Sequence, residues 1–140
     1  MRRRAAGGVR ALLEIDTNVV VRYLMADDPD QFDRASRAIE NHDVRVSATV
    51  LLETEWVLRS VYRRSQIAIV QALRAFVRLP RVVLADRAAT LNAFAWAEAG
   101  MDFADAIHLA GTAGADAFLS FDRDLAKQAS KLGAPSVRPP

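Results

Sequence analysis

The sequence contains no cysteine, and this absence excludes several classes of protein at once. A chain without thiols has no disulfide framework, no thiolate zinc site and no cysteine nucleophile. It suits a reducing compartment, so we expect a cytoplasmic protein. Long apolar runs are also lacking, because no stretch approaches the roughly 20 residues that a membrane-spanning helix needs.

Lysine is nearly absent, because only Lys127 and Lys131 are found among the 19 basic residues. Arginine therefore carries most of the positive charge, and its planar guanidinium suits bidentate contact with phosphate. The net charge of +2 is too balanced to indicate a nucleic-acid-binding protein by itself.

The length of 140 residues predicts one domain. Hydrophobic residues make up 51% of the chain, which argues against disorder and provides for an ordinary core. Residues 1–10 are rich in arginine and glycine, and we expect them to form a flexible basic arm. Residues 11–140 are expected to form a single domain.

Short apolar runs alternate with helical patterns along the chain. We predict strands over 12–15, 44–47, 82–84 and 117–121 and near Val137, with helices between them. This alternation is typical of an α/β fold, with a central, mostly parallel sheet of four to five short strands flanked by helices. In such sheets the site lies beyond the carboxyl ends of the strands.

Acidic residues stand at two of these strand ends and on two helices. Asp16 and Asp122 each follow a predicted strand, although either one alone is equally well explained as a helix N-cap. Glu53 and Asp105 share largely apolar helix faces, where an ionised carboxylate is costly unless it is paired or bound to a cation. Spacing alone does not choose between Glu53 and its neighbour Glu55.

These four carboxylates would repel one another if the fold brings them together. A divalent cation removes that repulsion, and oxygen ligands favour Mg²⁺ or Mn²⁺ over zinc. Clusters of this kind activate water and stabilise phosphate oxygens during phosphodiester hydrolysis. The pattern therefore suggests a metal-dependent hydrolase, provided that the four side chains converge.

Four motifs in order resemble those of the PIN-domain ribonucleases, and most closely the VapC-type toxins of bacterial toxin–antitoxin pairs. They are IDTNVVVRYL, VLLETEWVLRSVYR, DFADAIHLA and FLSFDRDLAK. The resemblance extends from about Leu12 to Gly133. Each motif is weak alone, and their order and spacing make the resemblance specific.

The resemblance implies a set of site residues. It maps the catalytic and metal-binding carboxylates to Asp16, Glu53, Asp105 and Asp122, and it selects Glu53 over Glu55 because Trp56, Val57 and Leu58 follow. It gives supporting positions to Asn18, Ser120 and Asp124. The arm over 1–10 has no counterpart in the family pattern.

The resemblance also implies a function. We expect a Mg²⁺- or Mn²⁺-dependent endoribonuclease that a cognate antitoxin protein holds inactive. It implies a homodimer and a larger toxin–antitoxin assembly, which binds DNA only through the antitoxin and has no contact with a membrane. The alternative is a PIN-fold module that binds RNA or protein without catalysis, and a metal-dependent ribonuclease assay separates the two.

Overall fold

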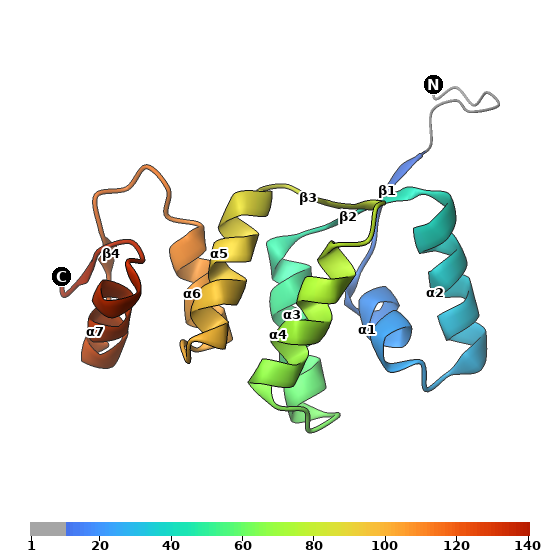
Figure 1. Cartoon of the computed structure of the whole chain (residues 1–140), viewed down its shortest axis with the longest axis horizontal. Coiled ribbons are helices and arrows are strands. Elements are labelled where there is room, and N and C mark those ends of the chain that lie inside the picture. The colour runs from blue at the N-terminus through green and yellow to red at the C-terminus, as the bar shows by residue number, and fades with distance from the viewer. Residues whose placement is uncertain (1–10) are drawn as a thin grey trace.

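Figure 1 shows the computed structural model of the chain, which describes residues 11–140. The expected arm over 1–10 lies outside these described residues. The elements follow the predicted alternation: β1 (Leu12–Glu14), α1 (Thr17–Met25), α2 (Pro29–Asn41), β2 (Asp43–Val46), α3 (Ala48–Ser60), α4 (Gln66–Val77), β3 (Val82–Leu84), α5 (Arg87–Glu98), α6 (Phe103–Ala110), β4 (Phe118–Leu119), α7 (Arg123–Leu132) and β5 (Val137–Arg138). No helix among the described residues is long and apolar enough to cross a membrane.

All strands pair in parallel, but they are divided between two sheets. The first sheet has the order β1-β2-β3, with Val44 of β2 opposite Leu13 of β1 and Val82 of β3. The second contains β4 and β5, with Phe118 opposite Val137. The predicted α/β fold with short parallel strands is confirmed, whereas the one central sheet is replaced by a sheet of three strands and a sheet of two.

Each helix in the described chain begins with an aspartate or serine whose side chain accepts a hydrogen bond from a backbone N–H of the first turn. These N-caps are Asp16, Asp28, Ser47, Ser65, Asp86, Asp102 and Asp122. The helix α6 ends at Ala110, because turns follow from Gly111. Gly114 has φ of +89°, a conformation that favours glycine.

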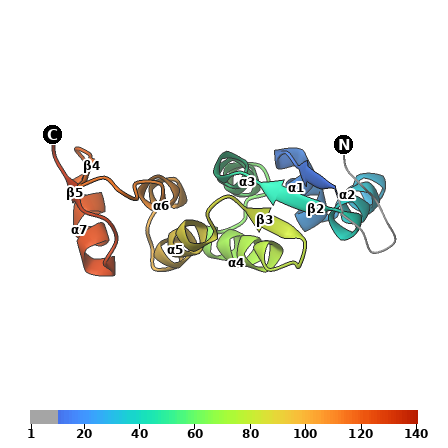
Figure 2. The ribbon, with the colours of Figure 1, turned by 90° about the horizontal axis from the view of Figure 1, so that it is seen from above.

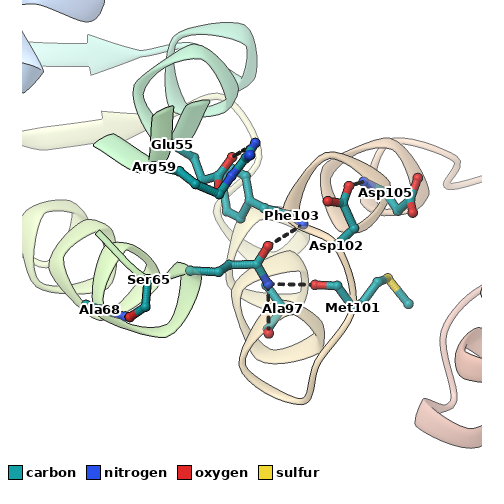
Figure 3. Close-up of polar contacts among 10 residues, drawn as sticks. Glu55, Arg59, Ser65, Ala68, Ala97, Met101, Asp102, Phe103 and Asp105 are labelled. Atoms are coloured by element: carbon teal, nitrogen blue, oxygen red, sulfur yellow. Dashed lines mark hydrogen bonds and ion pairs between the residues drawn. The ribbon is translucent and has the colours of Figure 1, made fainter. Parts of the chain in front are cut away.

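The core joins the first sheet to the helices that follow it. Phe94 of α5 stacks on Phe103 of α6 with ring centroids 6.1 Å apart, and both rings are fully buried. Gln66 fixes this helix pair to the start of α4. Its Nε2 donates to the carbonyls of Ala97 and Met101, and its Oε1 accepts from the N–H of Phe103 (Figure 3).

The elements β4, α7 and β5, hereafter the C-terminal unit, lie at one end of an elongated molecule. Figures 1 and 2 show α5 and α6 between this unit and the first sheet, with β1 and α2 toward the opposite end. Leu125 and Ala129 of α7 are buried and join the hydrophobic core. The C-terminal unit is therefore held away from β1 of the same chain.

Candidate functional site

Thr17, the residue after Asp16, brings Asp16 and Glu53 close together. Asp16 follows β1 and caps α1, where its Oδ1 accepts from the N–H of Val19 at 3.3 Å. The buried Thr17 donates from Oγ1 to Oε1 of Glu53 at 2.5 Å, and this bond joins the start of α1 to the middle of α3. Sequence reasoning missed Thr17, although its place inside the first motif could have revealed it.

The apolar surroundings expected for Glu53 on α3 belong to Glu55 instead. Glu53 is exposed, and Glu55 is the carboxylate that α3 buries, with 2% of its surface exposed. The reason is that α3 is apolar on two faces and turns Leu51 and Leu58 inward with Glu55. Glu55 is paired with Arg59, whose Nε donates to its Oε2 at 2.8 Å (Figure 3). Glu55 is thus committed to an ion pair, while the second oxygen of Glu53 faces solvent.

Asp105 and Asp122 form a second acidic pair. Asp105 lies in the first turn of α6 and is half-buried. Burial raises the pKa of Asp105, the negative charges of Asp102 and Asp122 raise it further, and the exposed His108 opposes them. Asp122 is exposed and caps α7.

The four carboxylates do not form one cluster within the described part of a protomer. Among the described residues, no three of the His, Asp and Glu side chains lie together in a way that could hold a metal ion. The expected convergence of Asp16 and Asp122 at one sheet edge is absent, because β4 pairs only with β5 in the described part of the chain. The donors suit a hard cation by their chemistry, since all are carboxylates, but one protomer divides them into two halves.

The predicted supporting residues lie beside these two pairs. Ser120 accepts from the backbone N–H of Asp122 at 3.0 Å and so fixes the turn into α7. Asp124 is exposed in the first turn of the same helix. Asn18 lines a groove of about 390 Å³ between α1 and α2, together with Arg22 and Arg34.

A second groove, of about 430 Å³, runs along α3 beside Glu53. Its walls include Trp56, which is 55% exposed, and Arg59. An exposed indole and a guanidinium next to a carboxylate offer a stacking surface and a phosphate contact. The sequence pattern did not predict this groove.

The short parallel strands, the flanking helices and the acidic residues place the chain among α/β proteins with a carboxylate-rich site. The sequence model of the PIN domain matches residues 13–131, and the chain therefore belongs to the PIN domain family. This confirms the family resemblance of the motifs.

Two solved structures are similar to the chain. One is VapC20 of Mycobacterium tuberculosis, a sarcin-ricin loop cleaving toxin, with 25% sequence identity over 92% of this chain and 100% of that one, and a TM-score of 0.39. The other is VapBC2 of Rickettsia felis bound to a DNA fragment from its promoter, with 10% identity over 91% and 97% of the two chains and a TM-score of 0.39. A comparison with curated proteins finds no match.

Proposed function

We propose that this protein is a metal-dependent endoribonuclease that hydrolyses RNA phosphodiester bonds in the cytoplasm as the toxin of a toxin–antitoxin pair. Membership of the PIN domain family and the VapC-like order of the four motifs support this proposal. The observation that carries it furthest is the Thr17–Glu53 hydrogen bond. It holds an exposed carboxylate next to Asp16, and helix capping alone does not require that contact.

The four carboxylates would bind the metal ion together. Asp16, Glu53, Asp105 and Asp122 would hold Mg²⁺ or Mn²⁺, which when bound supplies an activated water and neutralises charge on the phosphate. Thr17 fixes the orientation of Glu53, and Ser120 fixes the turn that presents Asp122. These two hydroxyl groups restrict the orientations that the carboxylates of Glu53 and Asp122 adopt.

RNA would approach along the two grooves that flank Asp16 and Glu53. Arg22 and Arg34 line the groove beside Asn18, and Arg59 lines the groove beside Glu53. These guanidinium groups would contact phosphates, Arg59 with the N–H groups that its pair with Glu55 leaves free, and such contacts position a strand without reading its sequence. Trp56 offers its exposed ring to an unstacked base.

The antitoxin partner would cover the exposed apolar side chains near the turn between α3 and α4. Val61 is 63% exposed and Ile67 is 46% exposed, whereas Leu51, Leu58 and Val70 of the same two helices are buried in the core. An amphipathic segment of the antitoxin would bury Val61 and Ile67. A basic side chain of that segment would pair with the acidic site and block RNA. Binding of the antitoxin is therefore expected to inhibit RNA cleavage.

A non-catalytic PIN-fold binding module is the second candidate function. The separation of the two acidic pairs within one protomer favours it, because neither pair alone makes a metal site. The two candidates differ in whether RNA is cut when a divalent ion is supplied.

Purified protein incubated with total RNA and Mn²⁺ or Mg²⁺ tests this choice. We expect discrete cleavage products that EDTA abolishes and that Glu53→Gln removes. Glu98→Gln is the matched control, because Glu98 pairs with Arg74 away from the site and its loss should leave cleavage intact. Intact RNA with both metals would favour the binding module.

A further inference from the structure

The strand β1 has an unused edge. In the part of the chain that the structure describes, β1 pairs only with β2, and its other row of backbone groups is open to a further strand. Leu12 is 42% exposed and Leu13 is 38% exposed. Strands of parallel sheets are normally covered on both faces, so this apolar strand lacks a neighbour and part of its cover.

The strand β4 also has an edge without a partner strand in the described part of the chain. It has two residues and pairs only with β5 among the described strands, and an isolated two-stranded sheet is marginal in water. Leu119 is 55% exposed and Phe121, which follows the strand, is 85% exposed. A second open edge with apolar side chains is therefore present in the same chain.

These two edges do not meet within one protomer. Figures 1 and 2 show the C-terminal unit at the far side of α5 and α6 from β1. Besides the buried Leu125 and Ala129, the end of α7 and the segment after it help to hold it there, because Leu132 and Ala134 pack against the hydrophobic core. In this arrangement a strand that completes the first sheet comes from another molecule.

We propose that β4 of a second copy of this chain pairs in parallel with β1, and that the acidic site is assembled from both copies. Asp16 and Glu53 come from one copy, and Asp122 comes from the other; Asp105 lies on α6, which packs on α3 of its own copy. The catalytic part rests on the proposed function, whereas the strand pairing rests on the fold alone. A two-fold dimer closes this exchange, because each copy gives one β4 and receives one, and it contains two sites.

The spacing of the two strands agrees with this arrangement. Asp16 stands three residues after Leu13, and Asp122 stands three residues after Leu119. A parallel register that places Leu13 beside Leu119 therefore places the two aspartates side by side at the carboxyl ends of the strands. The same register covers both exposed leucines. It also explains how a chain whose described residues place no three acidic side chains around one metal position supplies a metal site.

Engineered cysteines test the strand pairing without any assay of activity, because the natural chain has none. Chains carrying Leu13→Cys and Leu119→Cys, with different tags, are co-expressed, purified through both tags and oxidised. We expect a disulfide between the two chains, since neighbouring strands place paired residues within reach of one. The matched control pairs Leu119→Cys with Val83→Cys, which is exposed on β3 at the opposite edge of the first sheet.

The outcomes of the cysteine experiment separate two arrangements. Cross-linking through Leu13→Cys that greatly exceeds the Val83→Cys control supports pairing between copies. A single chain with both Leu13→Cys and Leu119→Cys that forms only an internal disulfide, as a monomer, would overturn the proposal. Equal cross-linking in the test and control pairs would overturn it as well.

Complementation between two inactive chains tests the shared site. Asp16→Asn and Asp122→Asn are each expected to be inactive alone. A heterodimer of the two has one site with both aspartates intact, so an equal mixture should recover about a quarter of the wild-type activity. Asp16→Asn with Glu53→Gln is the control, and it should recover none, because both residues come from the same side of each site.

Failure of this inference is distinguishable from failure of the proposed function. An active wild type with no recovery in the Asp16→Asn and Asp122→Asn mixture would refute the shared site. A wild type that cuts no RNA with either metal would refute the nuclease, and the cross-linking result would then decide the pairing of β1 and β4.

Discussion

The buried carboxylate of Glu55 makes the stability of this protein depend on Arg59. Arg59→Met keeps most of the length of the side chain but leaves Glu55, whose side chain is 3% exposed, without its cation. Removing one partner of a fully buried ion pair costs about 3–5 kcal/mol. Arg59 is 47% exposed, so solvent already screens the pair, and we expect a cost of about 2 kcal/mol. For a chain of this size, that cost lowers Tm by about 4–8 °C.

Thermal unfolding followed by circular dichroism measures this effect. Arg37→Met is the matched control, because Arg37 makes the same kind of pair with Asp33 four residues away, but both side chains are exposed. Its loss should cost less than about 0.5 kcal/mol. The double variant Glu55→Gln/Arg59→Met should recover part of the lost stability, since it removes the unpaired charge. Equal Tm for the wild type and Arg59→Met would refute the structural role assigned to Glu55.

Three further predictions concern the carboxylates. Asp16→Asn should abolish RNA cleavage and leave the melting curve nearly unchanged, because asparagine caps a helix as well as aspartate does; cleavage at the wild-type rate would make Asp16 a cap only. Glu53→Gln should lower cleavage far more than Glu55→Gln when both are measured per folded molecule, and equal losses would contradict the choice of Glu53. Burial raises the pKa of Asp105, so its charge opposes folding and stability rises as pH falls through the folded-state pKa. In EDTA at neutral pH, Asp105→Asn should therefore melt at or above the wild type, and this difference should shrink in acid; a lower Tm at neutral pH would contradict the assignment.

Local structure could be predicted well from the sequence, because capping and periodicity act over a few residues. An aspartate such as Asp28 before Pro29 is typical of a helix N-cap, and it begins α2, as Asp102 begins α6. The partner of a strand could not be predicted in this way, because a short apolar run such as that at Phe118 does not specify which strand lies beside it. The division into two sheets therefore had no local sign in the sequence.

The candidate site was predictable in its residue types but not in its geometry. On α3 the apolar residues occupy two faces, so periodicity did not decide between Glu53 and Glu55, and Glu55 is the one inside. The choice between them came from the motif that continues into Trp56. Thr17 and Gln66 were not predicted, because each acts through contacts with residues more than 30 positions away.

Two of the proposed site residues serve the fold as well as the chemistry. Asp16 and Asp122 both cap helices, and asparagine or serine satisfies the same backbone donors. Selection for folding alone would therefore let these positions drift among several small polar residues. Only selection for activity would hold both of them as aspartate. A lineage that loses the activity is thus expected to change first at these caps, while its protein remains folded.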